Sequence, residues 1–221
     1  FLLFLIGSPQ SLRAQDQEAK VEISSKPNKV SAGDQRKFDY FFYEGLNLKA
    51  AGKFDAAYDA FNHCLAIDST ASAVLYELSS FYAQLNRPEK SLEMLRRAVA
   101  YSSDIFTYRL ALATMSRNLG MFGEASDEYE KLVKDYPGKP ELNYYLADTL
   151  TQEGEIGKAI DAYDALESSI GMSEALSMQK YKLYNALEQN DNAFKEVEKL
   201  AAKFQIQFIP EHGNSFADMG R

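Results

Sequence analysis

The sequence of 221 residues is poor in the residue types that build metal and redox sites. It has no tryptophan, two histidines (His63 and His212) and a single cysteine, Cys64. One cysteine cannot form a disulfide within the chain. His63 and Cys64 are adjacent, so on a helix their side chains point about 100° apart, whereas a metal site needs three or four converging ligands. We therefore expect no metal site and no cofactor.

Motifs for catalysis are also lacking. No Ser–His–Asp or Cys–His arrangement has a supporting motif, and the glycines fit helix ends rather than a phosphate-binding loop. Carboxylates are plentiful, but they recur at similar places in two successive segments and predict a solvated helix face. These carboxylates are Asp127, Glu128, Glu130, Asp161, Asp164 and Glu167. The sequence therefore predicts a protein that is not an enzyme.

Positive charge is scarce. The chain has 24 Lys and Arg against 32 Asp and Glu, a formal net charge of -8, and its basic residues do not cluster. Nucleic acids and anionic lipid surfaces are bound by clustered Lys and Arg. We therefore expect no nucleic-acid partner.

Long apolar runs are missing too. The run at residues 1–6 is too short for a bilayer, which needs about 20 residues. It is followed by Ser8-Pro9 and by Ala14-Gln15, an order that resembles the h-region and cleavage region of a secretory signal peptide. The Ala-Gln ending resembles exported proteins of the Bacteroides group. Residues 1–15 are thus interpreted as a partial signal peptide of a periplasmic or exported protein, with no integral membrane span after signal removal. A buried N-terminal strand or helix is the alternative.

Polar residues and turn formers, among them Pro27 and Gly33, predict a linker over residues 16–37. From residue 38 the sequence repeats every 34 residues without insertion. Each unit has two helix-length apolar patterns joined by a tight turn. The five units are 38–71, 72–105, 106–139, 140–173 and 174–204. Their turn positions are Gly52, Asn86, Gly120, Gly154 and Glu188. Glycine and asparagine suit the left-handed conformation that follows a helix.

Small and large residues alternate in register through these units. Helices that cross closely need small side chains at the crossing, with large apolar ones facing them. One small column is Gly45, Ser79, Ala113, Ala147 and Tyr181, and the other is Ala57, Ser91, Ala125, Ala159 and Ala193. The large residues are Leu78, Leu112 and Leu146 in the first helices and Phe61, Leu95, Tyr129, Tyr163 and Val197 in the second.

These columns and the period resemble the tetratricopeptide repeat family over residues 38–204. The third and fourth units match best, whereas the fifth departs from the pattern at Lys180, Tyr181 and Asn190. The aromatic residue that the family has in the first helix is matched by Phe41 alone; Leu75, Arg109, Asn143 and Ser177 stand at the other positions. The resemblance implies an all-α, right-handed α-solenoid of helix-turn-helix repeats.

In this family the first helices line a concave groove that holds a segment of a partner. Carried over by resemblance, the groove presents Phe42, Leu46, Tyr76, Ser80, Leu110, Thr114, Tyr144, Asp148, Met178 and Lys182. The resemblance implies a non-catalytic scaffold that binds a peptide segment of a partner protein, in assembly of cell-envelope complexes. Packing of Phe42, Tyr76 and Tyr144 against neighbouring helices is an open alternative for those residues.

Two other functions stay open at this point. The chain could be a structural or self-assembly module, with self-association through its C-terminal end, or the non-catalytic arm of a larger multidomain protein. Residues 205–221 lack the repeat columns and are interpreted as a non-repeat tail or a truncated end.

Overall fold

The computed structural model describes residues 30–204, and every regular element in that range is a helix. Each 34-residue unit contains one antiparallel pair of helices. The helices are α1 (Ala32–Ala50), α2 (Phe54–Ile67), α3 (Ser72–Gln84), α4 (Pro88–Tyr101), α5 (Phe106–Asn118), α6 (Phe122–Asp135), α7 (Glu141–Glu153), α8 (Ile156–Ile170), α9 (Glu174–Ala186) and α10 (Asn190–Lys203).

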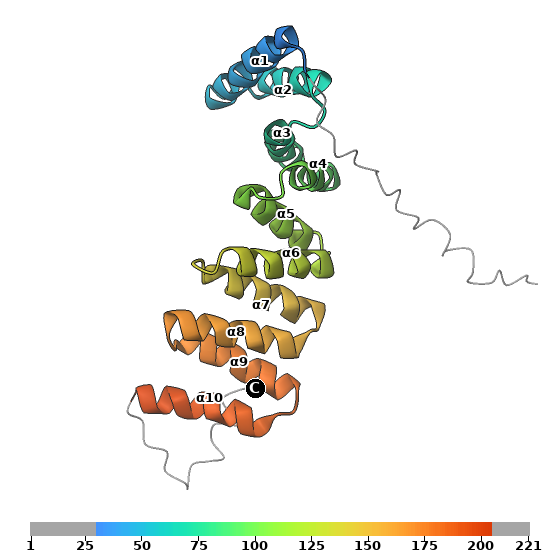
Figure 1. Cartoon of the computed structure of the whole chain (residues 1–221). Helices are drawn as coiled ribbons and strands as arrows, with labels where there is room; N and C mark the ends of the chain where they lie inside the picture. The colour runs from blue at the N-terminus through green and yellow to red at the C-terminus, as the bar shows by residue number, and fades with distance from the viewer. Residues whose placement is uncertain (1–29, 205–221) are drawn as a thin grey trace, which may run out of the picture.

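The pairs stack in chain order into an elongated solenoid, with α1 and α2 at one end and α9 and α10 at the other (Figure 1). All five predicted turn residues are left-handed, with φ of 73° at Gly52, 54° at Asn86, 75° at Gly120, 90° at Gly154 and 57° at Glu188. The predicted all-α solenoid is confirmed. No helix within residues 30–204 has the length and hydropathy that crossing a membrane requires.

The first helix begins at Ala32, inside the segment that we expected to be linker. Ser31 provides the cap, because its Oγ accepts a hydrogen bond from the Asp34 backbone N–H at 3.1 Å and donates one to the Asp34 carboxylate at 2.8 Å. The linker boundary at residue 37 is therefore wrong, since the cap outweighs the helix-weakening effect of Gly33. The segments predicted as signal peptide (1–15) and tail (205–221) lie outside the described residues.

A small residue faces a large one in the first helix pair, as the columns predicted. At Gly45 an added Cβ would come within 2.8 Å of the Phe61 ring, so only glycine fits between α1 and α2. The apolar core is divided into clusters. One surrounds Phe61 and Leu78 in the first two units, another surrounds Tyr129 and Tyr163 in the last three, and a small cluster of Leu92, Leu95 and Leu112 lies between them.

Two charged residues replace apolar ones inside the stack. Arg109 of α5 is buried and donates to Glu128 at 2.5 Å and to Asp135 at 2.6 Å, both on α6. Lys180 of α9 is fully buried, at the column position that holds Leu78, Leu112 and Leu146 in earlier units.

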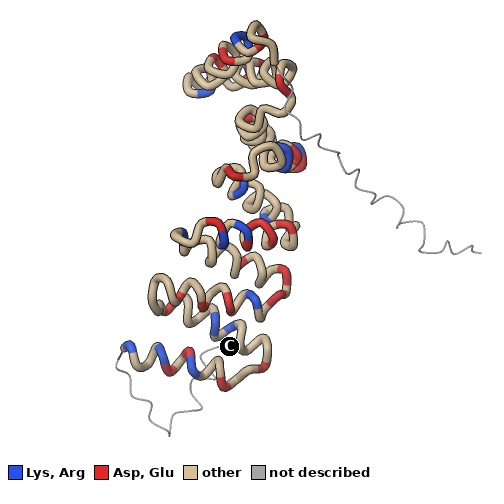
Figure 2. Tube along the Cα trace, in the orientation of Figure 1, with Lys and Arg blue, Asp and Glu red and all other residues tan. Residues whose placement is uncertain are grey.

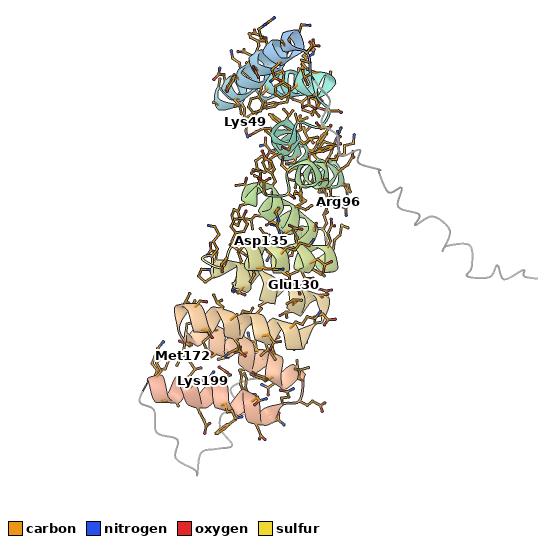
Figure 3. The ribbon with its side chains drawn as sticks, viewed as in Figure 1. Lys49, Arg96, Glu130, Asp135, Met172 and Lys199 are labelled. Atoms are coloured by element: carbon orange, nitrogen blue, oxygen red, sulfur yellow. The ribbon has the colours of Figure 1, made fainter. Side chains whose placement is uncertain are left out.

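The Lys180 ammonium joins three helices. It lies 2.8 Å from Asp164 and 2.6 Å from Glu167, both on α8, and 3.0 Å from Glu196 on α10. Lys199, labelled in Figure 3, adds contacts of 3.3 Å to Glu167 and 2.9 Å to Glu196. We call these five residues the Lys180 cluster. It occupies the junction between the fourth and fifth units.

The predicted solvated carboxylate face is therefore wrong in part. Asp127, Glu130 and Asp161 are exposed, but Glu128 is buried against Arg109 and Glu167 is largely buried against Lys180. A carboxylate can leave water when a cation is supplied by the neighbouring helix.

Candidate functional site

A hollow of about 410 Å³ opens between α3 and α5, and α4 forms its floor. We call it the α3–α5 hollow. It exists because three positions carry small side chains, Ser79 and Ala83 on α3 and Ala111 on α5, so that the two helices leave space between them. Its lining residues are Tyr76, Ser79, Ser80, Ala83, Ser91, Leu95, Thr107, Leu110, Ala111, Thr114, Met115 and Asn118.

Four predicted groove residues meet in this hollow: Tyr76 and Ser80 from α3, and Leu110 and Thr114 from α5. The structure thus brings together the members that come from the second and third units. The hollow is bounded by helices of those units alone, so the other six predicted residues do not line it.

The hollow contains no charged side chain, although 25% of the chain is Asp, Glu, Lys or Arg. Its polar groups are hydroxyls and the carboxamide of Asn118. The two helices that form its walls are themselves poor in charge: α3 carries Glu77 alone, and α5 carries Arg109 and Arg117. Figure 2 shows both helices as mostly uncharged.

A pair of stacked tyrosine rings lies at one edge of the hollow. Tyr76 stacks on Tyr108 of α5 with ring centroids 4.9 Å apart, which ties the second unit to the third. Burial raises the pKa of the Tyr108 hydroxyl above its usual value, so this ring stays neutral across the physiological range. Tyr76 therefore has both roles that we considered: it packs on a neighbouring first helix and still lines the hollow.

The side chain of Thr114 is held in place by a hydrogen bond to α6. Its Oγ1 lies 3.1 Å from the Tyr129 hydroxyl of α6, at hydrogen-bonding distance. Burial raises the pKa of Tyr129, so its hydroxyl stays protonated across the physiological range, and either hydroxyl can be the donor of this bond. Thr114 is thus a preset polar group at the wall of the hollow.

Phe42 and Leu46 pack into the core of the first two units rather than into the hollow. The Phe42 ring lies 6.2 Å from Phe61 and 6.0 Å from Phe38. Phe42 therefore packs against neighbouring aromatic residues, which was the alternative considered for it, and does not line the hollow.

The groove residues of the last two units lie apart from the hollow. Tyr144 and Met178 are exposed at 45% and 43%, and Lys182 is exposed as well. Asp148 accepts a hydrogen bond from Arg117 of α5 at 2.9 Å, so its charge is already paired. Asp148 therefore does not offer a free carboxylate to a ligand.

Sequence reasoning did not include several lining residues, among them Ala83, Thr107, Ala111 and Met115. The signal was present, because Ala83 and Ala111 are small residues at helix positions where other units carry longer side chains, such as Lys49, Arg117 and Tyr145. A small residue beside a groove position marks the place where the surface deepens.

The two residues considered for metal or thiol chemistry are both engaged in packing. Cys64 is fully buried with its Sγ 3.6 Å from the Phe38 carbonyl oxygen, and burial raises the pKa of its thiol to about 11. The His63 ring stacks on Phe41 at 4.8 Å. Among the residues that the structure describes, no three His, Cys, Asp or Glu side chains are placed to hold a metal ion.

Comparison with solved structures gives the same architecture. YrrB, described as a TPR protein with an unusual peptide-binding site, matches 87% of this chain and 100% of its own with a TM-score of 0.64 and 15% identity. MamA from AMB-1 matches 80% and 96% with a TM-score of 0.63 and 16% identity. MamA from Desulfovibrio magneticus RS-1 matches 78% and 98% with a TM-score of 0.59 and 12% identity. At these identities the likeness shows the fold alone.

Sequence comparison with curated proteins finds no match. Two family models match directly, both described as tetratricopeptide repeat, at residues 48–112 and 110–173. Together they span more than half of the chain and cover the turns at Gly52, Asn86, Gly120 and Gly154. With ten helices stacked in pairs over the described range, the chain belongs to the tetratricopeptide repeat family.

Proposed function

We propose that this protein is an interaction scaffold that captures a peptide segment of a partner protein on the surface formed by its first helices, at the α3–α5 hollow. Proteins of the tetratricopeptide repeat family are interaction modules, and that general role follows from membership. The peptide ligand and its place on the chain are the parts that we propose.

The observation that carries the proposal is the α3–α5 hollow itself. Its volume of about 410 Å³ falls within the range of roughly 300–1,000 Å³ that is typical of ligand pockets. It combines apolar floor residues with preset hydroxyls, and Tyr76 lies at its edge. Rigid aromatic residues such as tyrosine supply contact area at small entropic cost and are enriched in interaction hot spots. The solved relative YrrB is itself described as binding peptide.

The test is a pair of tyrosine variants in the full chain. Tyr76→Ala removes the ring at the edge of the hollow, whereas Tyr40→Ala removes a ring that is 65% exposed on α1, away from the hollow. After crosslinking in cells and identification of the crosslinked peptides, we expect the partner segment to crosslink next to α3 and α5. We expect its affinity to fall at least about tenfold in Tyr76→Ala and to stay unchanged in Tyr40→Ala.

Equal binding by both variants, with both still helical by circular dichroism, would remove the hollow from the interface. The Tyr144→Ala variant adds a second readout, because Tyr144 is exposed on α7 beyond the hollow. A partner segment that extends along the first helices toward the fourth unit loses affinity in Tyr144→Ala as well.

We also propose that the protein acts in the cell envelope, because residues 1–15 have the order of a signal peptide and its cleavage region. Cell fractionation tests this location. Recovery of the protein in the periplasmic or extracellular fraction supports it, and recovery in the cytoplasm contradicts it.

A further inference from the structure

The α3–α5 hollow has no charged lining residue, and each of the three helices that form it carries a residue held in a salt bridge. Arg117 of α5 binds Asp148, Lys49 of α1 binds Glu77 of α3 at 2.6 Å, and Arg96 of α4 binds Glu124 of α6 at 2.7 Å. A charged ligand group that enters the hollow would lose its hydration without gaining an opposite charge. The site therefore selects against charge.

The volume of the hollow, about 410 Å³, is enough for at least one bulky side chain. Ser79, Ala83 and Ala111 leave the space, and its apolar floor includes Leu95, which is 2% exposed, with Met115 beside it. Methionine adapts its shape to what packs on it, so the floor tolerates either an aromatic ring or a branched aliphatic chain. The hydroxyls of Ser80 and Thr114 and the Asn118 carboxamide surround this floor and suit the polar backbone of an extended segment.

The hollow also lies at the boundary between two apolar clusters of the core. The core of the first two units and that of the last three are separate clusters, bridged by Leu92, Leu95 and Leu112. Leu95 belongs both to this bridge and to the floor of the hollow. A side chain seated on Leu95 therefore adds apolar contact at the seam between the two halves of the solenoid.

From these three observations we propose that the α3–α5 hollow takes one large apolar side chain from an uncharged peptide segment, and that this anchor stiffens the junction between the second and third units. The inference rests on the proposed function and names the class of ligand and its effect. The specificity differs from recognition of an acidic or basic motif, because the hollow has no charge with which to recognise either.

The experiment uses the full chain and a phage-displayed library of random dodecapeptides. Peptides enriched on the protein are synthesised, and their dissociation constants are measured by fluorescence polarisation against three proteins. These are the unmodified chain, Ala83→Leu, which fills the hollow, and Ala66→Leu as the matched control. Both alanines are exposed and are the next-to-last residue of their helices, but Ala66 lies on α2 outside the hollow.

We expect the enriched peptides to share a Phe, Leu, Ile, Tyr or Trp flanked by uncharged residues. Their affinity should fall at least about tenfold in Ala83→Leu and stay the same in Ala66→Leu. Amide hydrogen exchange with a bound peptide should slow in α3, α4 and α5 more than in α9 and α10.

The remaining outcomes separate the two proposals. Enriched peptides that carry conserved charges but still lose affinity in Ala83→Leu would overturn the ligand class and leave the proposed function standing. Peptides that bind Ala83→Leu as well as the unmodified chain would overturn both, as would a library that yields no enrichment. Unchanged exchange in α3 to α5 on binding would overturn the stiffening of the seam.

Discussion

Two junctions of this solenoid join neighbouring repeats by opposite means. Between the second and third units the contact is apolar and incompletely filled, with the α3–α5 hollow over a bridge of three leucines. Between the fourth and fifth units the contact is charged, with Lys180 buried among carboxylates from α8 and α10. The difference teaches that one 34-residue pattern can place an open apolar surface at one junction and a buried cluster of charges at another.

The two junctions carry different residues at one equivalent position of the repeat. Leu112 of the third unit and Lys180 of the fifth stand 68 residues apart, at equivalent places in their first helices. A buried leucine tolerates incomplete packing, because an open apolar surface costs only its exposed area. A buried ammonium needs several oxygen partners in fixed places, since breaking one such pair leaves an uncompensated charge. The fifth unit is therefore fixed on the fourth in one arrangement.

The largest expected effect comes from removing the charge at the centre of the Lys180 cluster. Lys180→Met keeps an unbranched side chain of similar length, but it removes the buried cation from the Glu167 and Glu196 carboxylates. Their contacts with the partly exposed Lys199 remain. One oxygen of each, Glu167 Oε1 and Glu196 Oε2, already lacks a hydrogen-bond partner among residues 30–204. We expect a loss of about 3–5 kcal/mol in the free energy of unfolding of the fifth unit, measured by amide hydrogen exchange in α9 and α10.

Leu146→Met is the matched control for this change, because it places methionine at the same column of the fourth unit and should cost less than about 1.5 kcal/mol. Adding Glu167→Gln and Glu196→Gln to Lys180→Met should recover part of the loss. A Lys180→Met protein as stable as Leu146→Met would show that the cluster does not hold the fifth unit.

Lowering the pH should destabilise the junction between the fourth and fifth units before the junction between the second and third units. Burial opposes the charged form of Glu167, but hydrogen bonds from Lys180 and Lys199 outweigh it and lower the pKa of this carboxyl below its usual value. The stabilisation is therefore complete above the usual carboxyl pKa of about 4.3 and is lost as the pH falls through the lower, folded-state value. The Asp164 and Glu196 carboxylates contact the same ammonium, at 2.8 Å and 3.0 Å.

At the junction between the second and third units, the pKa of one carboxyl is also lowered. A hydrogen bond from Arg96 lowers the pKa of Glu124, but this pair is part-exposed and lies outside the leucine bridge. We expect amide exchange, corrected for its intrinsic pH dependence, to increase in α9 and α10 before it increases in α3 to α5 as the pH is lowered from about 7 to about 3. Opening of α3 to α5 first would reverse the comparison.

The helix pairs could be predicted from sequence because their causes are local. A 34-residue period, a glycine or asparagine after the first helix of four units, and small residues facing Phe61 or Tyr129 act within one unit. The roles of Arg109 and Lys180 could not be predicted in this way. Their partners come from other helices, and a sequence pattern treats a charged residue at an apolar position as a defect.

The site was predicted in part for the same reason. The family columns indicate which side chains point away from the second helices, and for Tyr76, Ser80, Leu110 and Thr114 that direction leads into the hollow. The columns do not say what fills the space beside them. Phe42 meets Phe61, Asp148 meets Arg117, and the hollow forms where Ala83 and Ala111 happen to be small.

The smallest expected effect is at the rim of the charged junction. Lys199 contacts the same carboxylates as Lys180, but its side chain is 43% exposed, so water and salt screen its interactions. Lys199→Met should cost at most about 0.5–1 kcal/mol, and added salt should reduce the difference. Lys195→Met on the same helix is the matched control, since Lys195 donates a hydrogen bond to the uncharged Asn192. If Lys199→Met destabilised α9 and α10 as much as Lys180→Met, the exposed lysine would stabilise the carboxylates as much as the buried one. The comparison of a buried charged junction with an open apolar one would then fail.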